Sequence, residues 1–394
     1  MTKEKAKEPQ IRFKGFTDVW EQRKLGEVTD SYSGGTPTAS KSEYYGGNIP
    51  FIRSAEINSD HTELFLTEEG LKSSSAKMVK VGDILYALYG ATSGDVGISQ
   101  LNGAINQAVL DIQPKDGYHS QFIMQWLRHQ KQKIVDKYLQ GGQGNLSGSI
   151  VKDLELLLPS TDEQAKIGEC FKNFDRLITL HQRKCDLLFK AKKTLLQKMF
   201  PKNGETTPEI RFKGFTGAWE QRKLSQMCQI TMGQSPDGTT YSDTPSDYIL
   251  VQGNADLKDG WVCPRIWTTQ KTKTADAGDL IMSVRAPAGA MGKTAYNVVL
   301  GRGVAGIKGN EFVYQILVKM DSEGHWKKLA AGSTFESINS DTVCNAEIIV
   351  PQDVKEQKAI GEYFKCLDTL ITLHQHELEK LQNIKKSCLK MMFV

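Results

Sequence analysis

The strongest constraint on this chain is that its sequence contains the same pair of segments twice. The first pair, repeat A, reads IRFKGFTDVWEQRKL at residues 11–25 and IRFKGFTGAWEQRKL at residues 210–224. The second pair, repeat B, reads EQAKIGECFKNFDRLITLHQ at residues 163–182 and EQKAIGEYFKCLDTLITLHQ at residues 356–375. Such repetition predicts successive copies of one structural unit. Because the blocks between the repeats diverge, we expect one scaffold that presents two different binding surfaces.

Length and composition fit a protein of two ordinary domains. The chain has 394 residues, of which 39% are hydrophobic and 24% charged, as in folded globular proteins. It contains no apolar run of about 18 residues and no apolar stretch behind its basic start, so we expect neither a spanning helix nor a signal peptide. The seven cysteines form no CxxC pair, which predicts free thiols and a cytoplasmic location. A net charge of +4 permits nucleic-acid binding without requiring it.

Each copy of repeat B predicts a long helix. Apolar residues recur at alternating spacings of three and four from Phe171 to Met199, and again from Phe364 to Met392, which indicates a heptad seam. Two such helices can bury their seams against each other. At about 1.5 Å per residue each reaches about 55–60 Å, long enough to act as a ruler.

Four polar residues interrupt these seams at equivalent positions. His181 matches His374, and Lys192 matches Lys385. Such polar layers either fix the register between the helices or lie at the edge of the seam and extend into solvent. No carboxylate or cysteine completes a metal site with the histidines, so we expect no bound metal.

The variable blocks, residues 26–158 and 225–350, predict α+β globules with long loops. Residues 84–89 and 280–284 are typical of strands. Residues 119–139 predict a helix, and residues 311–330 are its weaker counterpart. Loops that mix small, basic and aromatic residues can reach phosphates and read bases. A solvated turn is the alternative interpretation of each loop taken alone. The candidate DNA-binding residues are Thr36, Lys41, Tyr44, Arg53, Tyr89, Thr92, Ser93, Gln143, Asn145, Gln234, Tyr241, Gln252, Asn254, Arg285, Arg302 and Ser333.

The sequence carries no convincing catalytic motif. Residues 301–306 match GxGxxG, but a strand and turn suit the residues that follow better than the helix that a dinucleotide fold needs. Asp237, Asp256 and Lys258 resemble a nuclease pattern, yet residues 235–238 are first of all a turn. We therefore predict a non-catalytic binding protein without a cofactor. The alternatives are a coiled-coil scaffold or adaptor with two binding modules, and a metal-dependent nuclease at Asp237.

Four features in combination identify a resemblance. They are the repeated RFKGFTxxWEQRKL segments, the helix starts at Pro159 and Pro351 that lead to Glu-Gln pairs, the turn at residues 35–37, and the turn at residues 232–236. Over essentially its full length the chain resembles the DNA-specificity subunits of type I restriction-modification systems.

The resemblance implies an α+β fold with two tandem α/β target-recognition domains, separated by two long antiparallel helices in a pseudo-twofold repeat. Each domain reads one half of an asymmetric site in double-stranded DNA. Two modification subunits bind the conserved regions and carry the methylating site, and restriction subunits add ATP-driven translocation and cleavage. The implied domains are residues 1–158 and 206–350, and the implied spacer helices lie within residues 159–205 and 351–394.

Overall fold

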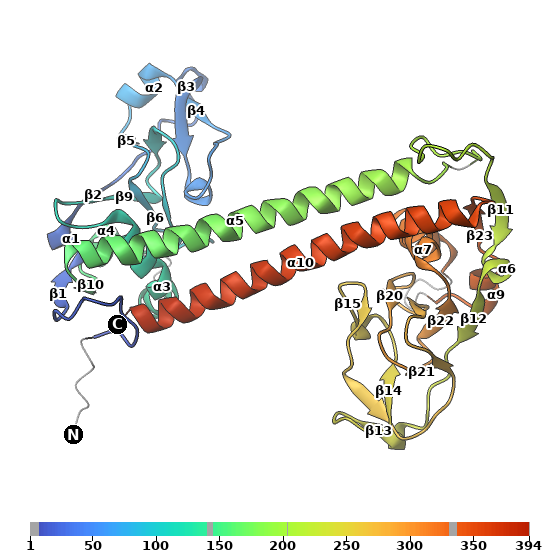
Figure 1. Cartoon of the computed structure of the whole chain (residues 1–394). Helices are drawn as coiled ribbons and strands as arrows, with labels where there is room; N and C mark the ends of the chain where they lie inside the picture. The colour runs from blue at the N-terminus through green and yellow to red at the C-terminus, as the bar shows by residue number, and fades with distance from the viewer. Residues whose placement is uncertain (1–7, 140–144, 203, 331–336, 394) are drawn as a thin grey trace. The chain divides into compact units, whose positions relative to one another are not determined.

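The computed structural model describes residues 8–139, 145–202, 204–330 and 337–393. They form two compact units. Unit 1 comprises Met1–Leu180 with Leu378–Val394, and unit 2 comprises His181–Glu377. Each unit contains one variable block and a part of each long helix (Figure 1). Helices and strands are both present in each unit, so the predicted α+β class is confirmed.

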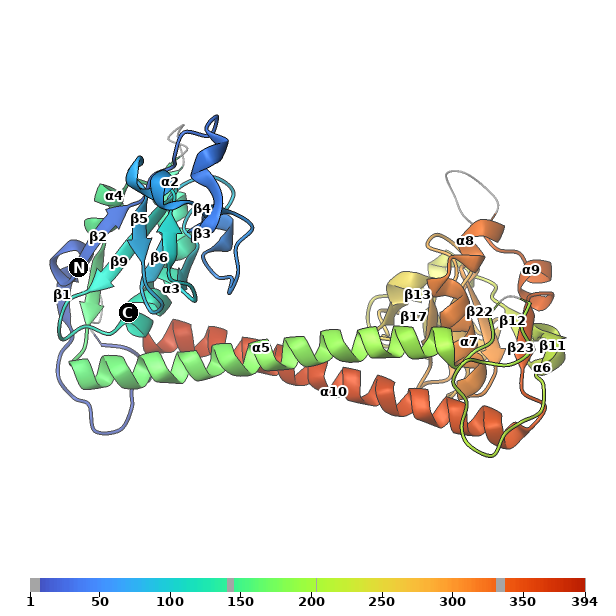
Figure 2. The same cartoon turned by 90° about the horizontal axis from the view of Figure 1, so that it is seen from above.

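The variable block of unit 1 contains two four-stranded sheets and the helix α3 in layers. The helix α3 (Ser120–Tyr138) lies between the first sheet and the long helices (Figure 2). In spatial order, the first sheet contains β2 (Thr29–Ser33), β9 (Val109–Pro114), β6 (Ile84–Ala87) and β7 (Val96–Ile98). The second sheet contains β4 (Phe65–Leu66), β3 (Tyr45–Ile52), β8 (Gly103–Ile105) and β5 (Lys77–Val79).

The strand β6 shows why the layers stack in this way. Successive residues of a strand point to opposite faces of its sheet. Ile84 and Tyr86 pack into the apolar layer beneath α3, whereas Leu85 and Ala87 pack into the layer toward the second sheet. Because both faces are covered, the strand is a continuous apolar run in the sequence rather than an alternating one.

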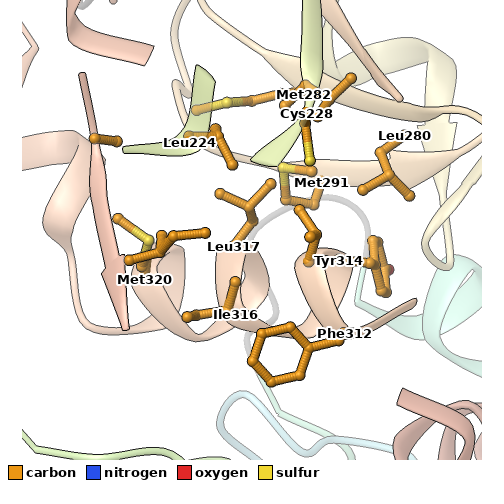
Figure 3. Close-up of a cluster of buried hydrophobic side chains, with 14 of the residues drawn as sticks. Leu224, Cys228, Leu280, Met282, Met291, Phe312, Tyr314, Ile316, Leu317 and Met320 are labelled. Atoms are coloured by element: carbon orange, nitrogen blue, oxygen red, sulfur yellow. The ribbon is translucent and has the colours of Figure 1, made fainter. Parts of the chain in front are cut away.

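Unit 2 repeats these layers with more strands. Its first sheet contains β12 (Gln229–Met232), β22 (Val304–Lys308), β19 (Leu280–Ser283), β20 (Met291–Lys293), β16 (Trp261–Val262) and β15 (Leu257–Lys258). Its second sheet contains β13 (Tyr241–Ser242), β17 (Ile266–Thr268), β14 (Tyr248–Val251), β21 (Val298–Leu300) and β18 (Thr274–Ala275). Figure 3 shows Phe312 and Leu317 of α7 (Glu311–Ser322) in the same buried cluster as Leu280 and Met282 of the first sheet.

The two long helices are α5 (Thr161–Lys198) and α10 (Val354–Met392). Within unit 1, Phe171 of α5 contacts Phe393, which follows α10, with ring centroids 5.7 Å apart. Within unit 2, Phe200 packs on Phe364 in the same way, with centroids 6.0 Å apart. The end of one helix thus meets the start of the other in each unit, so the helix segments run antiparallel there.

Repeat A holds the start of each long helix. The strand β1 (Glu21–Lys24) pairs with β10 (Glu155–Leu158), and β11 (Glu220–Lys223) pairs with β23 (Glu347–Val350) in the same antiparallel register. Arg12 binds the buried carboxylate of Glu163 at 2.7 and 2.9 Å, and Arg211 binds that of Glu356 at 2.6 and 2.7 Å. Two parallel charge-assisted hydrogen bonds fix the orientation of each pair.

Short helices complete the units. Those of unit 1 are α1 (Leu25–Val28), α2 (Glu68–Lys72), α4 (Gly148–Lys152) and the 3₁₀ turns η1 (Ser42–Tyr44) and η2 (Ser54–Glu56). Those of unit 2 are α6 (Leu224–Met227), α8 (His325–Leu329), α9 (Ser340–Cys344) and the 3₁₀ turns η3 (Gly238–Thr240) and η4 (Asn254–Asp256).

The predicted elements of the variable blocks are present. The helix expected at 119–139 is α3, and the strands expected at 84–89 and 280–284 are β6 and β19. The weaker helix expected at 311–330 is interrupted into α7 and α8. Gly324 lies between them with a φ of 72°, a left-handed conformation that glycine adopts without a steric penalty.

Candidate nucleic-acid interface

The two units share one backbone frame where β6 and β19 end. In unit 1 the Leu88 N–H donates to the Ala108 carbonyl at 2.8 Å, and the Leu88 carbonyl accepts from Leu146 at 2.9 Å. In unit 2 Val284 makes the equivalent bonds to Gly303 and from Ile338, both at 2.9 Å. An isolated bridge follows in each unit, Tyr89 with Asn145 and Arg285 with Ser337. Tyr89 and Arg285 therefore occupy equivalent positions.

A second set of bonds extends this equivalence to the neighbouring strand. Gly34 N–H donates to the Val109 carbonyl at 3.2 Å, and Gly233 N–H donates to the Val304 carbonyl at 2.9 Å. By this alignment Thr36 matches Ser235, and Gln107 matches Arg302. We call the residues Thr36, Tyr89, Gln107 and Asn145 the sheet-end cluster of unit 1, and the residues Ser235, Arg285, Arg302 and Ser337 the sheet-end cluster of unit 2.

Both clusters need glycine where the chain crosses the end of the sheet. A Cβ atom on Gly34 would lie 1.9 Å from the Ile105 carbonyl oxygen, and one on Gly233 would lie 2.1 Å from the Gly301 carbonyl oxygen. No side chain fits at such distances. The close approach of two backbones brings Thr36 and Ser235 to their positions.

The sheet-end cluster of unit 1 is neutral and bonded internally. The Thr36 hydroxyl donates to Oε1 of Gln107, and the Tyr89 hydroxyl donates to the Gln107 carbonyl. Thr36, Gln107 and Asn145 are exposed. This cluster offers amide and hydroxyl groups, which both donate and accept hydrogen bonds.

The sheet-end cluster of unit 2 is cationic. Arg285 and Arg302 are both exposed, and the Arg302 backbone N–H donates to the Ser235 hydroxyl at 3.1 Å. Within the described part of the chain, no hydrogen bond or ion pair engages either guanidinium. The two guanidinium groups of this cluster offer donors only.

Other predicted DNA-binding residues of unit 1 are buried or make contacts within the fold. Arg53 binds Glu56 and Glu63, each at 2.8 Å, and these hydrogen bonds raise the pKa of its guanidinium. Lys41 Nζ donates to the Tyr44 hydroxyl at 2.8 Å. Tyr44 and Ser93 are buried, and Thr92 is half-buried in the same turn as Ser93. Gln143 lies outside the described residues.

In unit 2 the remaining described candidates lie in or next to strands of the two sheets. Gln234 is exposed and directly precedes Ser235 of the cluster. The Tyr241 hydroxyl donates to the Pro236 carbonyl at 3.3 Å. Gln252 and Asn254 flank a turn in which the Asp256 carboxylate accepts the Gln252 N–H at 2.7 Å. Ser333 lies outside the described residues.

Asp237 and Asp256, the carboxylates of the nuclease alternative, make contacts within the fold. The buried Asp256 binds Arg265 at 2.9 Å in addition to its backbone donors. Asp237 accepts the Thr239 N–H at 2.9 Å, a hydrogen bond that lowers the pKa of this carboxyl. Among the residues that the structure describes, no group of three or more His, Cys, Asp or Glu side chains is placed to hold a metal ion.

The polar seam residues make matched contacts between the long helices. Lys192 Nζ lies 2.5 Å from a carboxylate oxygen of Asp368, and Lys385 makes the equivalent pair with Asp175. The lysine side chains are only 13% and 12% exposed, so they lie within the helix pair rather than extending into solvent. Nδ1 of His181 lies 3.2 Å from Nδ1 of His374.

Each carboxylate of these pairs has a further partner in the variable block. Gln125 of α3 donates to Asp175 at 2.7 Å, and Gln315 of α7 donates to Asp368 at 2.8 Å. Arg128 adds a second cation to Asp175 at 3.1 Å. The polar layers thus connect the shared helices to the block that differs between units.

Sequence reasoning missed Gln107, Ser235 and Ser337 of the sheet-end clusters, and the carboxylates Asp175 and Asp368. A signal existed for the last two, because both lie in repeat B. The equivalence of Gln107 with Arg302 emerges only when residues 106–108 are aligned with residues 301–303, and that of Ser235 with Thr36 only when Gly233 is aligned with Gly34. Both alignments depend on the strand pairing. A separate observation concerns membranes: in the described ranges, each helix is too short or too polar to span a bilayer.

Comparisons with known proteins agree with this geometry. A family model described as Type I restriction modification DNA specificity domain matches residues 17–188 and again residues 217–383. A Methanocaldococcus jannaschii protein, described as the type I restriction enzyme MjaX specificity subunit, is 27% identical over 95% of this chain and 92% of its own length. The Escherichia coli EcoR124I/EcoR124II specificity subunit is 24% identical over 40% of this chain and 41% of its own length.

A solved structure has the same fold. The crystal structure of the type I restriction-modification S subunit from M. genitalium superposes with a TM-score of 0.71 over 98% of this chain and 99% of that one, at 14% identity. At this identity the likeness concerns the fold alone.

Proposed function

We infer the function of this chain from its family: it belongs to the type I restriction modification DNA specificity proteins, whose model matches both of its repeated halves. It is a DNA-specificity subunit with two tandem recognition domains. Such a subunit has a non-catalytic role, and two tandem domains fit a site in two parts.

One observation carries the proposal that the two parts differ. The two sheet-end clusters share a backbone frame but present different side chains, amides and hydroxyls in unit 1 and arginines in unit 2. Direct readout depends on the donors and acceptors offered to base edges. Each unit therefore reads its own half of an asymmetric site in double-stranded DNA.

Catalysis belongs to partner subunits in this proposal. Two modification subunits bind the conserved regions, methylate the DNA and bring their own cofactor, and restriction subunits supply translocation and cleavage. The chain acts with them in the cytoplasm, where the DNA lies.

The long helices set the gap between the half-sites. Lys192 with Asp368, and Lys385 with Asp175, are charge pairs within an otherwise apolar seam. A polar layer of this kind stabilises one register over others, because a slipped register leaves a buried charge without its partner. His181 and His374 form a third polar contact between the helices.

Exchange of one variable block tests this function. Residues 26–158 are replaced by the corresponding block of a relative, and the methylated motif is read by sequencing DNA from cells that carry the complete system. We expect one half of the motif to change while the other half and the gap remain. A change in both halves would contradict the assignment of one half-site to each unit.

A further inference from the structure

Arg285 and Arg302 lie at the same end of the first sheet of unit 2. The register of β19 and β22 ends with Ser283 opposite Val304, and the bond from Val284 N–H to the Gly303 carbonyl continues it by one residue. Arg285 follows Val284 and Arg302 precedes Gly303, so this bond brings the two arginines to the same end of the sheet. Two like charges held near each other repel.

Nothing in the described chain offsets this repulsion. Two other arginines outside the strands do have carboxylate partners. Arg53 binds Glu56, and Arg265 binds Asp256. Among the described residues neither Arg285 nor Arg302 has such a partner, and both side chains are exposed. Two neighbouring guanidinium groups without a carboxylate partner in the described ranges can bind acceptors that another molecule supplies.

The corresponding pair in unit 1 shows that the frame does not require arginine. Tyr89 and Gln107 occupy the same two positions, and the hydroxyl of Tyr89 bonds to the Gln107 backbone. The cationic pair is therefore a property of unit 2 alone. A phosphate contact would serve both half-sites alike, because the DNA backbone is the same in each. A cationic pair in unit 2 alone therefore favours a contact with the bases of one half-site.

We propose, on the basis of the proposed function, that Arg285 and Arg302 read guanine in the half-site bound by unit 2. Guanine presents two acceptors, N7 and O6, on its major-groove edge, and a guanidinium donates two parallel hydrogen bonds to them. Each of the other bases presents an amino donor or a methyl group on this edge. A guanidinium has no acceptor for the amino group and no hydrogen bond to make with the methyl group. The half-site of unit 1 is read without a cationic pair.

The test uses the full chain in complex with its modification subunits. The block exchange assigns each half of the methylated motif to a unit. Duplexes carrying that motif are then made with each guanine replaced in turn by 7-deazaguanine, which lacks the N7 acceptor. We expect at least one replacement in the half-site of unit 2 to weaken binding by the wild-type complex about tenfold.

Variants at the two positions identify the reader. Arg285→Gln and Arg302→Gln are each expected to weaken binding to the unmodified site, and at least one of them abolishes the effect of 7-deazaguanine. Arg285→Lys keeps the charge but loses the planar fork, so it is expected to relax the choice of base. Gln107→Ala in unit 1 is the matched control and leaves the guanine effect intact.

Three results would overturn the inference while leaving the proposed function in place. They are a half-site of unit 2 without a G·C pair, no effect of any 7-deazaguanine there, and an equal loss on all DNA sequences, which indicates a phosphate contact. A wild-type complex that methylates no bipartite site would instead remove the proposed function, and this inference with it.

Discussion

Lys192 and Lys385 are related by the internal repeat, yet their removal should have unequal effects. Substitution by methionine removes the ammonium group and keeps an unbranched apolar stem in the seam. After Lys192→Met, Asp368 retains one described donor outside its own helix, Gln315 at 2.8 Å. After Lys385→Met, Asp175 retains Gln125 at 2.7 Å and a second cation, Arg128, at 3.1 Å.

The magnitude follows from burial and from the partners that remain. Loss of one member of a fully buried pair costs about 3–5 kcal/mol, and loss of an exposed pair costs less than about 1 kcal/mol. Lys192 and Asp368 are 13% and 27% exposed, so we expect a loss of about 2–3 kcal/mol in the free energy of unfolding. For Lys385→Met we expect about 1 kcal/mol. Burial lowers the pKa of Lys385, so its charged form is already less favoured in the folded chain.

Native-state hydrogen exchange measures the loss of local stability that each of the two substitutions causes. Lys192→Met should reduce protection in α7 and the adjoining part of α5, and Lys385→Met should reduce protection in α3 by a smaller amount. The control is Lys192→Met with Asp368→Asn, which removes the unpaired charge and should recover part of the loss. Equal losses for the two lysines, or a larger loss for Lys385→Met, would refute the reasoning.

Other predictions concern the core, the sheet end, the helices and the whole chain. Burial raises the pKa of Asp111 to about 6 from 3.8, so the folded chain binds a proton that the unfolded chain releases between these values. Stability should therefore fall by about 1–3 kcal/mol as pH rises through this window, and Asp111→Asn should remove the fall in urea unfolding. Gly233→Ala would place a methyl group 2.1 Å from the Gly301 carbonyl oxygen, so motif sequencing should show the half-site of unit 2 lost and the other retained. One heptad inserted after His181 and one after His374 should lengthen the preferred gap by about three base pairs and leave the bases unchanged, whereas an unchanged gap would show that the helices do not set it. The isolated chain, with a net charge of +4, should bind DNA weakly and with a strong dependence on salt, and nanomolar specific binding without partners in an electrophoretic shift would contradict this.

The sequence was sufficient for the features that depend on local pattern. Repeat B has the heptad spacing of a long helix, and α5 and α10 begin and end close to the expected residues. The helix α3 was predictable for the same reason, since its apolar residues recur at helical spacing and face one layer.

The candidate site was less predictable because it depends on strand pairing. Arg285 and Arg302 were both candidates, but their proximity follows from the pairing of β19 with β22 and from the bond between Val284 and Gly303, which no local pattern specifies. Gln107 has no motif of its own and enters the site only as the neighbour of Tyr89. The engagement of Arg53 by Glu56 and Glu63 was equally hidden, because a charged residue in a loop gives no indication of its partners.

The division of α10 between the units has a consequence for the order in which the protein can mature. Unit 2 is contiguous in the chain, so all of its residues have been synthesised once Glu377 is made. Unit 1 begins earlier but needs Met392 and Phe393, which pack in its core, where Phe393 contacts Phe122 and Phe171. Because domains fold as their residues emerge during synthesis, the first unit to be translated is the last that can close. Loss of residues 378–394 would therefore damage the recognition domain of the first variable block, which lies more than 200 residues earlier in the chain.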